Sequence, residues 1–181
     1  MIYGVDTAVI ACGGFGTRLK KINKSKPKCL TKLQNNKTIL LNQIEELRKN
    51  KINYIYLLCY FESNQIIEYI KRKKIKNVHC IVEKKPLGDF GSIIQNADIF
   101  QKKFIYILGD IFFNFNFKKF INYHNKKKSD LTIYGHKNNH YLDSDKIVYN
   151  SKYRIVKIVN KFKKNARPHF NLINSGISLI N

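Results

Sequence analysis

Residues 8–19 read AVIACGGFGTRL, a short apolar run that leads directly into a glycine-rich loop. We expect residues 8–10 to form a buried strand. Gly13, Gly14 and Gly16 let the backbone adopt positive φ and approach a ligand closely, and free N–H groups in such a loop attract phosphate oxygens. The spacing matches neither a Walker A loop nor the dinucleotide-binding GxGxxG loop, because Leu19 occupies the final glycine position. The glycines alone therefore predict either a phosphate-binding loop or an ordinary tight turn.

The segment that follows the loop favours phosphate binding. Pro27 restricts the backbone between Lys26 and Lys28, and so fixes the direction in which Lys28 leaves the chain. A lysine beside a phosphate loop can neutralise charge that develops on a phosphoryl group. Arg18 can contact two phosphate oxygens at once. Either cation alone would more often be a solvated surface residue.

The net charge of +22 over 181 residues raises the question of nucleic acid binding. Lys (29), Asn (21) and Ile (26) are abundant and Arg (5) is rare, a bias that AT-rich codons produce. The lysines are dispersed, with no stripe of interleaved aromatic residues, so we expect no nucleic acid partner. The charge still attracts anionic substrates such as nucleotides.

Three further features concern the setting of the protein. No apolar run approaches the roughly 18 residues of a membrane span, and the first residues lack the pattern of a signal peptide. The cysteines at positions 12, 29, 59 and 80 include no CxxC pair, which makes zinc an unfavourable interpretation. Cys59 and Cys80 lie in apolar runs and are expected to be small core residues. We therefore expect a protein of the reducing cytoplasm with no membrane partner.

Apolar runs alternate with helical patterns along the first three quarters of the chain. The spacing predicts helices over 39–49, 63–72, 91–100 and 117–127, and strands over 54–59, 78–82, 104–108 and 131–134. This alternation predicts an α/β fold with a mostly parallel sheet and helices on both faces. In such sheets ligands bind beyond the carboxyl ends of the strands.

The last part of the chain has a different pattern. Residues 146–149 and 155–159 are expected to be short strands, antiparallel to each other. Residues 177–181 lie in a further apolar strand with no helix after it to cover it. This ending indicates a truncated C-terminal part or an edge strand held by a partner, and a homo-oligomer is one such arrangement.

GGFGTRL at 13–19, followed by KPK at 26–28, resembles the signature of the sugar-nucleotide pyrophosphorylases, nucleotidyltransferases that activate sugar 1-phosphates. Further segments agree in order and spacing from about residue 7 to residue 181. EKKPLGDFG at 83–91 resembles the family's E-x-x-PLGTxGA loop, and LGD at 108–110 its strand-ending GD. The segment ending at Asn160-Lys161 resembles that of its Glu-Lys pair, and NSGI at 174–177 its NAGIY strand. Residues 109–117, with 123–124 and 129–133, most resemble heptose 1-phosphate guanylyltransferases.

The resemblance implies a Rossmann-like three-layer, GT-A-like fold and one nucleotidyltransferase domain over 1–181. Residues 1–135 would form its nucleotide-binding part and residues 136–181 an incomplete sugar-phosphate-binding part. The implied reaction converts an NTP, with GTP favoured, and a heptose or mannose 1-phosphate to an NDP-sugar and pyrophosphate, with Mg²⁺ as cofactor.

The resemblance also assigns roles to residues. Those of catalysis would be Arg18, Lys28 and Asp110, with Asp110 holding Mg²⁺ at the end of a buried strand. Those that bind the nucleotide would be Gly13, Gly14, Gly16, Thr17, Glu83, Gly88 and Gly109. Those that bind the sugar phosphate would be Asn160, Lys161 and Asn174.

Several positions depart from the family pattern. Asn160 replaces a glutamate that grips sugar hydroxyls, and Asp89 and Phe90 replace small residues, so that Phe90 would narrow the nucleotide cleft. By the resemblance, the family's second metal-binding aspartate lies beyond residue 181, which leaves Asp110 as the single carboxylate. The alternative hypothesis is therefore a weak or inactive nucleotide-binding subunit of the same fold.

Overall fold

A single mixed sheet runs through the molecule. The computed structural model describes residues 4–15, 26–100, 102–137, 145–160 and 172–181, and in these residues eight strands form one sheet. Its order is β3-β2-β1-β4-β8-β6-β7, and β5 pairs with β8 outside this path. The strands are β1 (Thr7–Ala11), β2 (Tyr54–Cys59), β3 (Val78–Val82), β4 (Phe104–Leu108), β5 (Leu131–Lys137), β6 (Lys146–Tyr149), β7 (Ile155–Val159) and β8 (Leu172–Ile180).

The parallel half of the sheet consists of β1 to β4. β1 lies between β2 and β4, and β2 pairs with β3, all in parallel. The side chains of Ala8, Val9 and Ile10 are fully buried, as are those of Ile105 and Ile107 in β4. Continuous apolar runs of this kind are typical of strands that are covered on both faces. The α/β fold class and this parallel core are therefore confirmed.

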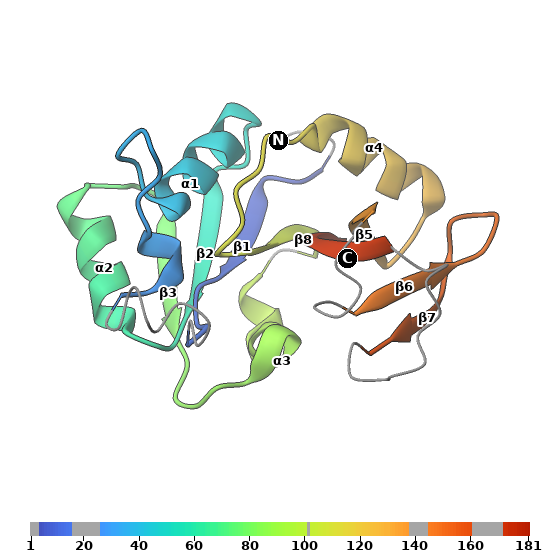
Figure 1. Cartoon of the computed structure of the whole chain (residues 1–181). Coiled ribbons are helices and arrows are strands. Elements are labelled where there is room, and N and C mark those ends of the chain that lie inside the picture. Colours follow the sequence, from blue (N-terminus) through green and yellow to red (C-terminus); the bar gives the residue numbers. More distant parts are fainter. Residues whose placement is uncertain (1–3, 16–25, 101, 138–144, 161–171) are drawn as a thin grey trace.

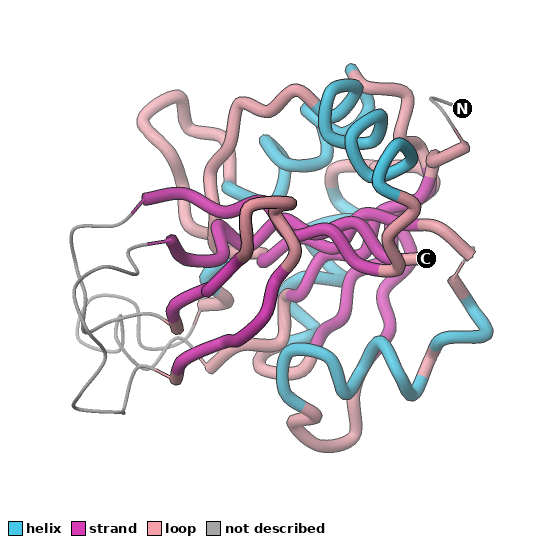
Figure 2. The backbone as a smooth tube through the Cα atoms, turned by 90° about the vertical axis from the view of Figure 1, so that its right-hand side faces the viewer, coloured by secondary structure: helices cyan, strands magenta, loops and turns pink. Residues whose placement is uncertain are grey.

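Helices cover both faces of the sheet. α1 (Ile39–Lys49), α2 (Ser63–Arg72) and α4 (Phe117–Lys127) contribute to one apolar cluster. α3 (Gly88–Gln95) contributes Ile93 to a second cluster, which also holds Val9 and Tyr106. Figure 1 shows α3 on the opposite side of the sheet from α1 and α4, and Figure 2 shows the strands between the helical layers. Among the described helices, none is both long enough and apolar enough to span a bilayer.

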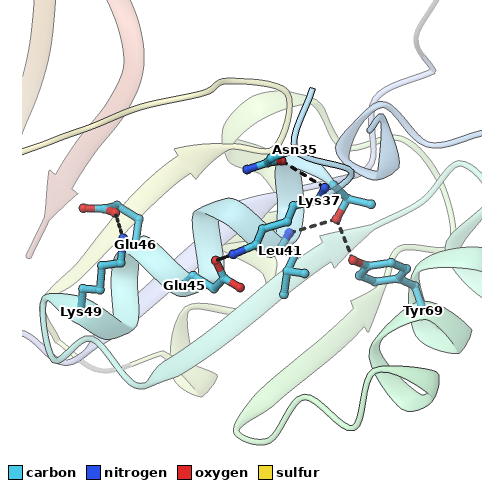
Figure 3. A network of polar contacts seen from close by, with 8 residues as sticks. Asn35, Lys37, Leu41, Glu45, Glu46, Lys49 and Tyr69 are labelled. Atoms are coloured by element: carbon cyan, nitrogen blue, oxygen red, sulfur yellow. Dashed lines mark hydrogen bonds and ion pairs between the residues drawn. The ribbon is translucent and has the colours of Figure 1, made fainter. Parts of the chain in front are cut away.

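α1 is fixed at its start by a capping contact. Thr38 is its N-cap, and the Thr38 hydroxyl accepts a hydrogen bond from the backbone N–H of Leu41 at 3.1 Å. The same hydroxyl donates to the Tyr69 hydroxyl of α2 at 2.9 Å (Figure 3). A side-chain cap satisfies one of the free N–H groups of a first helical turn. Thr38 therefore sets where α1 begins and ties it to α2.

The helix expected over 91–100 differs in its bounds. α3 begins three residues earlier, at Gly88, and ends at Gln95, and a 3₁₀ turn, η3 (Ala97–Ile99), follows. The Asn96 side-chain amide donates to the Ser92 carbonyl at 2.8 Å. Asparagine side chains compete in this way for backbone groups, which disfavours asparagine inside a helix. The interruption at Asn96 has this local cause.

The C-terminal half of the sheet is antiparallel. β6 pairs with β7, as expected, and β8 pairs with β5 on one edge and with β4 and β6 on the other. Ile177 and Leu179 of β8 are buried in the main core. The expectation that the last strand is an edge held by a partner is therefore wrong. Its partners are strands of the same chain, and pairing over such sequence distances leaves no local signal.

Candidate active site

The glycine loop leaves the carboxyl end of β1 in a closely packed setting. Cys12 donates its backbone N–H to the Leu58 carbonyl at 2.8 Å. A Cβ at Gly13 would lie 3.2 Å from Cβ of Tyr60, whereas one at Gly14 would meet no atom within 4 Å. Neither of these glycines has a positive φ. The expected positive φ is thus wrong for Gly13 and Gly14. At Gly13 a side chain would be crowded by Tyr60, whereas at Gly14 there is open space for one.

The turn after β4 lies against the start of this loop. Gly109 donates its backbone N–H to the Ala11 carbonyl at 2.9 Å, and a Cβ at Gly109 would lie 2.5 Å from that oxygen. Real Cβ atoms do not approach an oxygen this closely, so only glycine fits without a backbone shift. Gly109 therefore lets β4 place Asp110 beside the β1 loop.

Lys28 and Asp110 form an ion pair across this end of the sheet. Lys28 Nζ lies 2.9 Å from Asp110 Oδ2, and the two side chains are 25% and 42% exposed. Lys28 begins the 3₁₀ turn η2 (Lys28–Leu30), and Pro27 accepts a backbone hydrogen bond from Leu30 at 3.0 Å. The structure thus brings together a lysine and a carboxylate that are far apart in the sequence. Because both side chains reach solvent, a ligand can contact them. A solvent-exposed ion pair also contributes little to stability.

Two buried thiols, those of Cys12 and Cys29, lie next in sequence to Gly13 and Lys28. All four cysteines lie in the described residues and are free. A hydrogen bond with the Cys29 thiol and burial raise the pKa of Cys12, so that it stays a neutral thiol. Cys59 is fully buried, and Cys80 on the neighbouring strand is half-buried. The expectation of a core residue is confirmed for Cys59, whereas Cys80 is partly buried and packs against the core.

The segment from Glu83 to Phe90 leads from β3 into α3. Glu83 donates its backbone N–H to the Cys59 carbonyl at 2.8 Å, and its carboxylate accepts from the Leu87 N–H at 3.3 Å. Gly88 has φ +76°, a conformation that favours glycine. The Phe90 ring packs against Tyr106, with centroids 5.5 Å apart, and Phe90 remains 42% exposed. The Glu83 carboxylate therefore holds a turn next to the parallel strands.

The residues expected to bind the sugar phosphate lie on the antiparallel half. Asn174 of β8 accepts a hydrogen bond from the Gly176 N–H through its side-chain oxygen at 2.8 Å. Asn160 follows β7 directly and is exposed. The other predicted residues, Gly16, Thr17, Arg18 and Lys161, lie outside the described residues. Asn174 lies in β8 and Asn160 directly after β7, whereas Asp110 follows β4 of the parallel half.

An aromatic cavity of about 450 Å³ adjoins the Asp110 turn. Its lining residues come from the segment after Asp110, from β5 and from β8: Ile111, Phe112, Phe113, Asn114, Phe115, Tyr134, His136, Ser175 and Ile177. Ser175, the neighbour of Asn174 in β8, lines this cavity. The sequence did not indicate the cavity, because β5 meets β8 only in the folded chain.

A glycine loop, a lysine and a carboxylate meet at the carboxyl ends of neighbouring parallel strands, the place where α/β proteins bind their ligands. The profile of the family described as Nucleotidyl transferase matches residues 7–178. The chain belongs to this nucleotidyl transferase family.

Individual relatives agree with this assignment. The bifunctional protein GlmU of Methanococcus maripaludis is 33% identical over 170 residues, which are 94% of this chain and 39% of the relative. The D-glycero-alpha-D-manno-heptose 1-phosphate guanylyltransferase of Campylobacter jejuni is 34% identical over 113 residues, 62% of this chain and 51% of the relative. The chain thus spans about two fifths to one half of these curated relatives.

The crystal structure of HddC from Yersinia pseudotuberculosis superposes with a TM-score of 0.82 at 28% identity. The match covers 98% of this chain and 77% of HddC. A second crystal structure of HddC is a complex with GMP-PN and superposes with a TM-score of 0.81. This likeness confirms the nucleotidyltransferase fold.

Proposed function

We propose that the chain transfers a nucleotidyl group from an NTP, with GTP favoured, to a heptose or mannose 1-phosphate. A phosphate oxygen of the sugar 1-phosphate attacks the α-phosphorus of the NTP, and the bond from that phosphorus to the bridging oxygen breaks. The products are the NDP-sugar and pyrophosphate. The observation that carries the proposal is the Lys28–Asp110 pair beside the β1 loop. GTP is supported by the relative named a guanylyltransferase and by the HddC complex with GMP-PN.

Lys28 would stabilise the negative charge that grows at the α-phosphate. Its side chain is 25% exposed and its ammonium group lies 2.9 Å from Asp110, so its charge is screened less than that of a freely solvated lysine. No covalent intermediate is needed, because positioning and charge stabilisation supply most of the catalysis in phosphoryl transfer. In the same proposal, Arg18 faces the departing pyrophosphate.

Asp110 is the residue that would hold Mg²⁺. Among the described residues no three His, Cys, Asp or Glu side chains gather in one place. Mg²⁺ nevertheless fits, because proteins bind it through one or two carboxylates together with substrate phosphates and waters, and the Asp110 carboxylate is exposed. When bound there, Mg²⁺ would neutralise phosphate charge. Lys28 would then release the carboxylate and turn to the phosphates.

The remaining predicted residues divide between the two substrates. Gly13, Gly14, Gly16 and Thr17 would cradle the nucleotide, with Glu83, Gly88 and Gly109 along its cleft. Asn160, Lys161 and Asn174 would bind the sugar 1-phosphate. Residues 1–135 and 136–181 would in this way be the nucleotide and the sugar-phosphate parts of one site.

A pyrophosphate-release screen tests the proposal. The four NTPs are each combined with mannose, heptose, glucose and N-acetylglucosamine 1-phosphates in the presence of Mg²⁺. We expect release with GTP and with one of the first two sugars. Nucleotide-dependent thermal stabilisation without pyrophosphate release would instead favour a nucleotide-binding subunit.

A further inference from the structure

Gln43 is a polar side chain in the middle of the core. It lies on α1, its exposed fraction is 0%, and it is packed on the face that carries Leu40, Ile44 and Leu47. Its side-chain amide Nε2 donates to the Leu108 carbonyl at 2.9 Å and to the Ile111 carbonyl at 2.8 Å. These carbonyls belong to the residues directly before Gly109 and directly after Asp110. The Gln43 amide therefore bridges the two ends of the turn that carries Asp110.

Besides the Lys28–Asp110 ion pair, few described hydrogen bonds hold this turn. Its own closing hydrogen bond, from the Ile111 N–H to the Leu108 carbonyl, is 3.5 Å long. Hydrogen bonds of this length are weak. The one shorter backbone contact is that of Gly109 with Ala11 at 2.9 Å, which fixes the turn before Asp110 but not after it. Among the described contacts, the Gln43 amide is the one that fixes both sides.

This arrangement costs free energy. Both N–H groups of the amide are used, because a carbonyl can only accept, so Oε1 cannot exchange places with Nε2. Oε1 is buried and has no hydrogen-bond partner among the described residues. A buried acceptor without a partner is destabilising, and an apolar side chain here would instead leave the Leu108 and Ile111 carbonyls without the amide that donates to them. Packing alone therefore does not account for a glutamine at this position.

We infer that Gln43 is a positioning residue, which holds the Asp110 carboxylate in the orientation that binds Mg²⁺ with the nucleotide. The inference rests on the proposed function for what Asp110 binds, and on the two hydrogen bonds for how Asp110 is held. Gln43 is too deeply buried to touch a substrate, so it acts through the turn alone.

Gln43→Met tests this inference, because methionine matches the shape of glutamine but lacks the amide. The readout is the factor by which Mg²⁺ tightens GTP binding, measured calorimetrically in the full chain without any sugar 1-phosphate. We expect this factor to fall by about 10- to 100-fold, the usual effect of removing a group that orients a metal ligand. The melting temperature should fall, because the Leu108 and Ile111 carbonyls lose the amide that donates to them.

Two further variants serve as controls. Ile44→Val changes the next buried residue of α1, which has no polar group, and should leave the Mg²⁺ factor unchanged. Asp110→Asn should reduce the Mg²⁺ factor to about one. If the Mg²⁺ factor is unchanged in Gln43→Met but falls to about one in Asp110→Asn, the inference is overturned and the proposed function stays intact.

Hydrogen exchange separates the inference from the proposed function. In Gln43→Met the amides of residues 109–115 should exchange faster than in the parent chain, while those of α1 should not. If the parent chain shows no Mg²⁺ effect on GTP binding, the proposed function fails together with the Mg²⁺ part of the inference. Unchanged exchange at residues 109–115 would refute the positioning role itself.

Discussion

The central strands β1 and β4 and the outer strand β7 differ sharply in how deeply they are buried. Four of the five residues of β1 and of β4 are buried, whereas β7 has four exposed residues and one half-buried residue. Asp110 and the glycine loop extend from β4 and β1, while Asn160 follows β7. The groups proposed to act on phosphate are therefore attached to the firmest part of the molecule. The comparison shows that Asp110 and the glycine loop are anchored by buried strands, whereas Asn160 follows an exposed one.

The largest effect should come from removing either charge of the Lys28–Asp110 pair, at the end of the parallel strands. Lys28→Ala and Asp110→Ala should each lower the rate of pyrophosphate release by about 10³-fold, or about 4 kcal/mol, because each removes charge at the reacting phosphate. Both variants should keep the fold, since the pair is exposed. Lys32→Ala, in a separate cavity of about 410 Å³, and Asp98→Asn are matched controls. Wild-type rates in both site variants would show that the assigned residues are not the active site.

The next effect contrasts the cores of the two halves. Ile105→Ala in β4 removes a fully buried side chain and should lower the free energy of unfolding by about 3 kcal/mol. Val156→Ala in β7, where the valine is 61% exposed, should change it by less than about 0.5 kcal/mol. Urea unfolding of the two variants measures the difference. Equal losses would mean that β7 is covered in solution and that the contrast is wrong.

A smaller effect on stability concerns two glycines next to the parallel strands β1 and β4. Gly109→Ala would place a Cβ against the Ala11 carbonyl and should cost about 2 kcal/mol of stability. Gly14→Ala would meet no atom within 4 Å and should change stability by less than about 0.5 kcal/mol. Thermal unfolding of both variants is the measurement. A tolerated Gly109→Ala would contradict the close approach of β4 to the loop.

The smallest effect is a pH dependence at the junction of the two halves. Burial lowers the pKa of His124 below the usual value of 6.5. Its Nε2 lies 3.0 Å from Asn181 Oδ1, which can only accept, so Nε2 carries the proton of the neutral ring.

Because the unfolded chain takes up a proton on His124 more readily, stability should be constant above the unfolded value and fall as the pH drops below about 6.5. Urea unfolding at pH 7.5 and pH 5.5 measures this loss. His124→Gln, which removes the titrating group, should reduce it. An equal loss in His124→Gln would assign the pH dependence to other groups.

The sequence predicted most of the parallel strands, and most of the helices that cover them, with their observed bounds. α1 and α4 follow from apolar residues at helical spacing, and β2 and β4 from continuous apolar runs. Local composition carries this information because each element is apolar on the face that it buries. The bounds of α3 were missed because the Asn96 side chain competes for the backbone.

The remainder depends on contacts between distant residues. That β8 lies between β4 and β5 could not be predicted, because strand pairing at long range has no local pattern. Lys28 was found from its place beside the glycine loop, and Gly109 and Asp110 through a resemblance, but the contact of Lys28 with Asp110 appears only in the folded chain. Gln43 was overlooked, although it lies on the same helical face as Leu40, Ile44 and Leu47. A polar residue within such an apolar stripe is a signal that could have found it.

The pairing of β4 with β8 has a consequence for synthesis on the ribosome. Phe104 lies beside Ile180, so the edge of β4 can acquire its partner only after nearly all of the described chain has been translated. Until then one edge of the apolar strand β4 has no partner, and such an edge can pair with other chains. Chaperones that hold nascent chains would therefore act on this protein mainly in the interval between the release of β4 and that of β8.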